Sequence, residues 1–184
     1  MPVQSDSTRT QVLSRLKIAI TKELNELMQA YQHRPMSAVA WTARNLLELL
    51  IWTEYCSESE ENAEIFANDC ARDAVDAIDL PAGFAIDEQF SHRDARAAII
   101  KKTKDAGFDS IDESYTRVSS AAKSVGLGEE FKYSNKLFSK FAHPTALMVM
   151  TPMDEFEQSF RAKFLDGGQR CAEQALARIE RFLG

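Results

Sequence analysis

MSAVAWTARNLLELLIWTEYC, residues 36–56, is the stretch that decides the fold. A helix on the surface of a domain shows one apolar stripe and one polar face. Here the apolar residues are spread around the whole circumference instead, and they are Val39, Ala40, Ala43, Leu46, Leu47, Leu49, Leu50 and Ile51. We therefore predict that residues 36–56 form the central, most buried helix of a helical bundle.

The rest of the chain predicts further helices packed around this one. Apolar residues recur at three- and four-residue steps from about residue 7 to residue 31, which is the period of a helix. Capping pairs and proline or glycine breakers mark off five more, at about 57–80, 91–107, 110–126, 129–142 and 151–182. No run of alternating apolar residues predicts a strand. We predict an all-α bundle of six or seven helices, forming a single helical domain over residues 1–184 with a flexible tail at 1–6.

Two local patterns refine these helices. Ser57 and Glu60 have the spacing of a capping box, which predicts that a helix begins at Ser57. Gly167 and Gly168 interrupt the last helix, and they predict that it is kinked or divided there.

Composition limits the classes of function. Hydrophobic residues make up 45% and charged residues 27% of the 184 residues, and the net charge is −6. Such values are ordinary for a globular protein. A negative net charge argues against a general affinity for nucleic acid, because phosphate binding needs clustered Lys and Arg. A local basic strip remains compatible with this charge.

The cysteines and the apolar runs predict a cytoplasmic protein. Cys56, Cys70 and Cys171 are far apart and odd in number, so we expect buried free thiols in a reducing compartment and no zinc site. The N-terminus has no apolar run of the kind found in signal peptides. The longest apolar stretch, about 46–52, is broken by Glu48 and is too short to cross a membrane, so we expect no membrane partner.

A polar stripe crosses the apolar helix at 36–56. It consists of Trp41, Arg44, Asn45, Glu48, Trp52 and Tyr55. Arg44 and Glu48 are four residues apart and close enough to pair. One interpretation is an ion pair at the edge of the bundle; the other is a pocket wall that presents Arg44 to an anion or a partner group.

A second polar set lies on the helix at 129–142. Tyr133, Lys136, Lys140 and His143 fall along one line, while apolar packing is expected from Phe131, Leu137, Phe138 and Phe141. His143 ends the helix, because the residue before a proline disfavours the helical conformation. It is either a C-terminal cap or a catalytic residue. Ser139 lies four residues before it, but no glycine-rich turn offers the oxyanion hole that a serine hydrolase needs.

Ionisable groups inside a bundle are costly unless they are paired. We therefore predict that the two segments meet, so that Arg44, Glu48, Ser139 and His143 share one enclosure within the fold.

These residues also carry a family resemblance. R-x-x-x-E at Arg44 and Glu48, with S-x-x-x-H-P-T from Ser139 to Thr145, resembles a bacterial family of helical proteins of unknown function. That family is in turn similar to the HEPN superfamily (higher eukaryotes and prokaryotes nucleotide-binding). The resemblance implies a HEPN-like fold, a homodimer and a role in bacterial stress or defence.

HEPN ribonucleases use an arginine, a short spacer and a histidine late in a helix. The resemblance places Lys136 at the arginine position and His143 at the histidine position. It implies a metal-independent reaction in which His143 moves the proton of a ribose 2′-hydroxyl and Lys136 or Arg44 stabilises the phosphorane charge.

Carboxylates on the helix at 57–80 suggest another enzyme class. They are Glu61, Glu64, Asp69, Asp73, Asp76 and Asp79. Their spacing is similar to the magnesium-binding pairs of all-α nucleotide pyrophosphohydrolases, but in that family the pairs come from two facing helices. A solvated acidic face is the alternative interpretation, and we predict neither a metal nor a cofactor.

We therefore predict an interaction or regulatory protein, with a HEPN-type ribonuclease and a pyrophosphohydrolase as alternatives. We consider three partners: a second copy of the chain, another protein, and RNA. The homodimer would form through a stripe at Phe156, Phe160 and Phe164. The candidate catalytic residues are His143, Ser139 and Lys136, and the candidate pocket residues are Arg44, Glu48, Trp41, Tyr133 and Lys140.

Overall fold

The computed structural model describes residues 7–76, 97, 98, 100, 101, 116–150 and 154–184, and in these residues it contains helices and no strand. The helices are α1 (Thr8–His33), α2 (Met36–Glu58), α3 (Glu60–Asp76), α5 (Val118–Ser124), α6 (Gly128–Ala142), α7 (Ala146–Met150) and α8 (Asp154–Leu183). The prediction of an all-α bundle is therefore confirmed. The predicted tail at 1–6, most of the helix predicted at 91–107, the start of the helix at 110 and the end of the helix near residue 80 lie outside the described residues.

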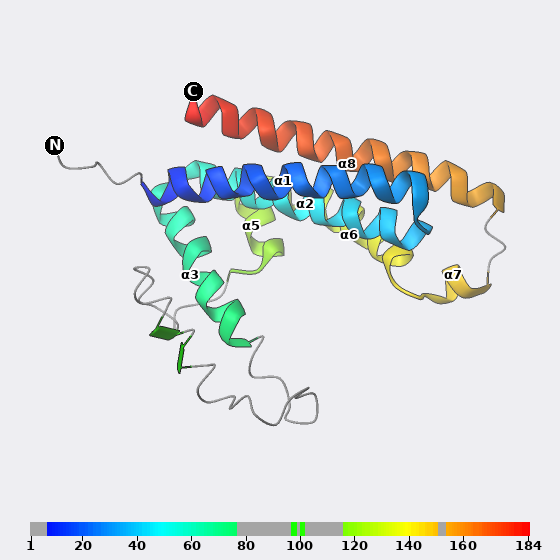
Figure 1. Cartoon of the computed structure of the whole chain (residues 1–184), viewed down its shortest axis with the longest axis horizontal. Helices are drawn as coiled ribbons and strands as arrows, with labels where there is room; N and C mark the ends of the chain where they lie inside the picture. Colours follow the sequence, from blue (N-terminus) through cyan, green and yellow to red (C-terminus); the bar gives the residue numbers. More distant parts are fainter. Residues whose placement is uncertain (1–6, 77–96, 99, 102–115, 151–153) are drawn as a thin grey trace.

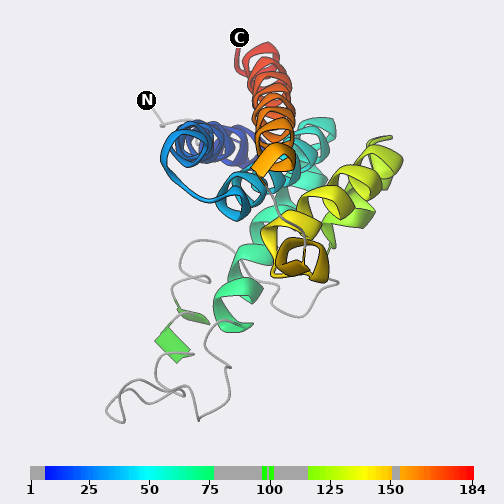
Figure 2. The same ribbon diagram turned by 90° about the vertical axis from the view of Figure 1, so that its right-hand side faces the viewer.

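Helix α2 is the centre of the bundle, as its sequence predicts. It packs against α1, α3, α5, α6 and α8, and α1, α2 and α8 follow the longest axis of the molecule (Figure 1). The end-on view places α1 and α6 on different sides of α2 (Figure 2). The most completely buried residues of α2 are Val39, Ala40, Ala43, Leu46, Leu50, Ile51, Thr53 and Cys56. Because α2 has neighbours on several sides, an apolar stripe on one side alone would not have covered these contacts.

Helix α8 runs as one helix through both of its glycines, so the predicted division there is wrong. Gly168 is buried against α1 and α2. A Cβ atom on it would lie 2.6 Å from Leu27 Cδ2 and 3.3 Å from Ala43 Cα. The glycine therefore allows α8 to approach α1 and α2 closely.

Aromatic side chains join α6 to α8. The ring centroids of Phe138 and Phe141 lie 5.3 Å and 5.2 Å from that of Phe164, and Phe141 lies 4.6 Å from Phe160. Phe164 is 0% exposed. It cannot form the dimer contact considered from the sequence, because its ring is already in the core; the side chain of Phe156 lies outside the described residues.

Polar side chains fix the helix ends. Ser59, and not Ser57, caps α3, since its hydroxyl accepts a hydrogen bond from the Asn62 N–H at 3.0 Å. Ser57 belongs to α2, where its hydroxyl donates to the Thr53 carbonyl at 2.6 Å. The capping-box prediction was therefore wrong by two residues, because α2 continues beyond Cys56 to Glu58.

Arg161 of α8 caps the C-terminus of α1. Its guanidinium donates to the carbonyl oxygens of Ala30, Tyr31 and Arg34 and contacts Glu157 Oε1 at 3.3 Å. This cation gives a donor to the carbonyls of Tyr31 and Arg34 and a second donor to that of Ala30, which already accepts from the Arg34 N–H. Its charge also interacts favourably with the negative end of the helix dipole.

Two of the three cysteines are buried free thiols, as predicted, but Cys70 is exposed. Cys70 lies on α3, which packs mainly against α1 and α2 among the described helices. Burial raises the pKa of the Cys56 thiol to about 12 and that of Cys171 to about 11. Within the described residues, no helix combines the length and the apolar character that crossing a membrane requires.

Candidate interaction site on helices α2 and α6

Arg44 is the centre of a polar network that joins α2 to α6. Its Nη2 atom lies 3.0 Å from Glu48 Oε1, and its Nε donates to Asn135 Oδ1 at 2.8 Å. All three side chains are partly buried. The predicted pairing of Arg44 with Glu48 is confirmed, and the network shows that the two segments meet. Because carboxylate and amide both hold the guanidinium, Arg44 is committed to contacts within the protein.

Asn135 is the member of this network that sequence reasoning missed. A signal was present, since Phe131, Asn135 and Phe138 follow one another at steps of four and three and so share a face of α6. Both phenylalanines are buried. A lone amide on a core-facing stripe needs a polar partner, and α2 supplies one.

His143 lies at the edge of this network and is exposed. Its ring packs edge-on against Trp41, with centroids 5.8 Å apart and an interplanar angle of 86°. The Arg44 Cζ atom lies 5.7 Å from the Trp41 ring centroid, so both His143 and Arg44 contact Trp41, and no ion pair or hydrogen bond joins His143 to Arg44 or Glu48 among the described residues. The predicted enclosure of His143 with Arg44 and Glu48 is therefore wrong. The reason is local: His143 precedes Pro144 and leaves the helix with φ −112° and ψ 155°.

Ser139 does not join His143 either. It is half-buried, and its hydroxyl makes no hydrogen bond to His143 or to any other described residue. The spacing of four residues would place the two side chains on one face only if the helix continued through His143. Instead, the Thr145 side chain closes the end of α6 by donating to the Lys140 carbonyl at 2.8 Å.

The line of residues predicted along α6 forms an exposed surface. Tyr133 is 66% exposed, Leu137 is 40% exposed, and Lys136, Lys140 and His143 are also exposed. The packing predicted for Leu137 is therefore wrong, because the core stripe of α6 passes through Phe138 instead. We call these five residues together with Trp41, which is 46% exposed, the α6 face.

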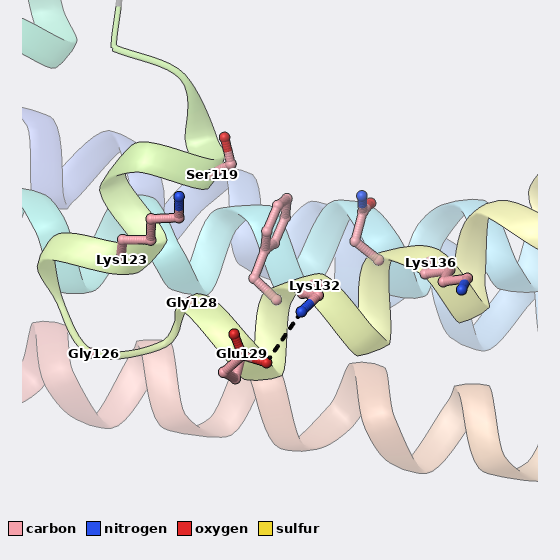
Figure 3. A pocket seen from close by; sticks show the side chains of 9 residues that line it. Ser119, Lys123, Gly126, Gly128, Glu129, Lys132 and Lys136 are labelled. Atoms are coloured by element: carbon pink, nitrogen blue, oxygen red, sulfur yellow. Dashed lines mark hydrogen bonds and ion pairs between the residues drawn. The ribbon is translucent and has the colours of Figure 1, made fainter.

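Beside the α6 face lies a groove between α5 and α6 with a volume of about 580 Å³. It is lined by Ser119, Lys123, Gly126, Gly128, Glu129, Phe131, Lys132, Asn135 and Lys136. Figure 3 shows Lys123 on α5 and Lys132 and Lys136 on α6, with Gly126 at the turn between the helices. Lys136 is the candidate residue that belongs to both the groove and the α6 face.

The acidic side chains of α3 do not gather into a site. No group of three or more His, Cys, Asp or Glu side chains in the described part of the chain is placed to hold a metal ion. Glu61, Glu64 and Asp73 are exposed. Burial raises the pKa of the Asp69 carboxyl, although a hydrogen bond from the Thr116 N–H at 3.4 Å opposes that shift. Asp79 and the side chain of Asp76 lie outside the described residues.

Comparisons of the chain with models of protein families, with curated proteins and with solved structures give no match.

Proposed function

We propose that the chain is an interaction module that recognises a partner protein through the α6 face. The observation that carries the proposal is the engagement of Arg44 by both Glu48 and Asn135. The one arginine of α2, which could otherwise serve as a catalytic or anion-binding group, is thereby tied into the scaffold, and no hydrogen bond joins Ser139 to His143. What remains accessible is a surface suited to binding.

The composition of the α6 face supports this proposal. Exposed Trp and Tyr side chains bury large areas with little loss of conformational entropy and are enriched at the centres of interfaces. Trp41 is held in place by the ring of His143, which reduces the cost of ordering it on binding. Lys136 and Lys140 add positive charge, so the partner surface is expected to be acidic.

Helix α7 adds apolar area next to this face. It follows α6 directly and buries none of its residues, and Leu147, Val149 and Met150 are all exposed. Exposed apolar groups that lie together are typical of interaction surfaces. The resemblance to helical bacterial proteins and to the HEPN superfamily is the support for a bacterial stress or defence setting.

A metal-independent ribonuclease of the HEPN type is the second candidate. It is favoured by the exposure of His143 on the same face as Lys136 and Lys140. Since Arg44 is held within the protein, the phosphorane charge would fall to Lys136, and a lysine lacks the planar fork of an arginine. A homodimer that joins two copies of the face would supply further cations.

The first test is affinity capture from cells that make the protein naturally. A Trp41→Ala/Tyr133→Ala variant should lose a discrete partner that the wild type retains, while Ile18→Ala, a change at an exposed position of α1, should keep it. Identical capture by all three proteins would overturn the proposal. In parallel, labelled RNA should stay intact with the wild type; cleavage that His143→Ala abolishes would favour the ribonuclease instead.

A further inference from the structure

The groove between α5 and α6 has the dimensions of a ligand site. Its volume of about 580 Å³ lies within the range of small-molecule pockets. Phe131, which is almost fully buried, contributes an apolar surface to it. Gly128 shapes one wall, because a Cβ atom there would lie 3.0 Å from Lys123 Cγ. The aliphatic part of the Lys123 side chain therefore lies against the start of α6, and a residue larger than glycine at position 128 would displace it.

The charge of the groove is opposite to that of the chain. Among the described lining residues are Lys123, Lys132 and Lys136 but only one carboxylate, Glu129, which leaves these residues with an excess of two positive charges in a protein of net charge −6. Lys132 pairs with Glu129 at 3.5 Å, but both side chains are exposed and such a pair is weak. Neither Lys123 nor Lys136 forms an ion pair within the described part of the chain. These two ammonium groups are therefore available to a ligand.

Asn135 adds a neutral donor whose orientation is fixed. Its Oδ1 accepts the hydrogen bond from Arg44 Nε at 2.8 Å, and Glu48 contacts the neighbouring Nη2 atom of the same guanidinium at 3.0 Å. The oxygen end of the amide is thereby committed to α2, and no described residue accepts a hydrogen bond from Nδ2. The polar network of α2 thus acts as the support for one lining residue of the groove.

We propose that this groove binds a small organic molecule that carries a phosphate group. The two unpaired ammonium groups, the Asn135 amide and the Ser119 hydroxyl can all donate to phosphate oxygens, while Phe131 can contact the organic part. A dianion matches the positive excess better than a single carboxylate does. The site is separate from the partner-binding role proposed for the α6 face, although Lys136 contributes to both.

Calorimetric titration with three probes tests the proposal: phenyl phosphate, inorganic pyrophosphate and uncharged phenol. Phenyl phosphate should bind and phenol should not, and binding should weaken as salt is raised. Tighter binding of phenyl phosphate than of pyrophosphate would show that the organic part is recognised. Equal or tighter binding of pyrophosphate would overturn the proposal, because the groove would then bind phosphate groups alone.

Variants locate the binding. Lys123→Ala and Asn135→Ala should each weaken the affinity for phenyl phosphate by about tenfold. Glu129→Gln should strengthen it by about threefold, since it removes the opposing charge. Lys22→Ala, at an exposed position of α1, is the matched control and should leave the affinity unchanged. Thermal melting verifies that each variant is folded. Absence of binding at about millimolar probe, or binding that Lys123→Ala and Glu129→Gln leave unchanged, would overturn the proposal.

Discussion

The two adjacent glycines of α8 should respond in opposite ways to the same substitution. Gly167→Ala places its methyl group 3.6 Å from Phe138 Cζ, an ordinary contact, whereas Gly168→Ala places it 2.6 Å from Leu27 Cδ2. Both changes gain about 0.5–1 kcal/mol because alanine favours a helix interior over glycine. Only the second also carries a steric cost.

The size of that cost follows from the surroundings of Gly168. Carbon atoms pack at about 3.5–4.0 Å, so Leu27 must move by about an ångström, and Leu27 is itself fully buried. Ala43 Cα and Leu46 Cδ1, both at 3.3 Å, limit movement in other directions. Overpacking of this kind costs about 1–3 kcal/mol. Gly167→Ala should therefore be the more stable variant by about 1–3 kcal/mol.

Urea unfolding followed by circular dichroism measures this difference. A double variant, Gly168→Ala/Leu27→Ala, provides the internal control, because removing the Leu27 side chain gives the added methyl room and should abolish most of the cost of Gly168→Ala. A Gly168→Ala protein as stable as Gly167→Ala would refute the close packing of α8 on α1 and α2.

Three further predictions concern the polar and thiol groups. Arg161→Ala should lower the free energy of unfolding by about 2 kcal/mol, measured in urea, since carbonyls at the end of α1 lose a charged donor; a change within about 0.5 kcal/mol would mean that water replaces the cap fully. A double-mutant cycle of Arg44→Ala and Asn135→Ala should give a coupling energy of about 1–2 kcal/mol, and independent effects would contradict the link between α2 and α6. Stability should fall as pH rises above about 9, because the thiols of Cys56 and Cys171 ionise in the unfolded chain from a pKa of 9.0 but in the folded chain only near 12 and 11. The unfolded state then binds fewer protons than the folded state, and each thiol lowers the free energy of unfolding by about 1.4 kcal/mol per pH unit in that window. Between pH 8 and pH 10 the free energy of unfolding should therefore fall less in a Cys56→Ala/Cys171→Ala variant than in the wild type.

The architecture could be predicted from the sequence where burial alone decides it. Apolar residues all round residues 36–56 identify the central helix, because only a helix with several neighbours can bury such a surface. The pairing of Arg44 with Glu48 could also be predicted, since residues four apart in a helix lie next to each other on its surface. Each of these inferences depends on local periodicity.

The remaining features depend on contacts between distant segments. A pair of glycines in a helix can mark a division or a close approach, and only the position of Leu27 on α1 decides between them. The His143 side chain is exposed because the helix ends before Pro144, and its ring packs against Trp41. Asn135 was identifiable as a polar residue on an apolar face, but its partner on α2 was not.

Site-specific photo-crosslinking in the natural host cells is the most direct test of the claim that the chain works by binding through the α6 face. A crosslinking amino acid would replace Tyr133 in one protein and Ile18 in another, two positions of similar exposure at 66% and 70%. The account predicts a discrete crosslinked protein from position 133 that is absent from position 18. No adduct at position 133, or the same adducts at both positions, would contradict it.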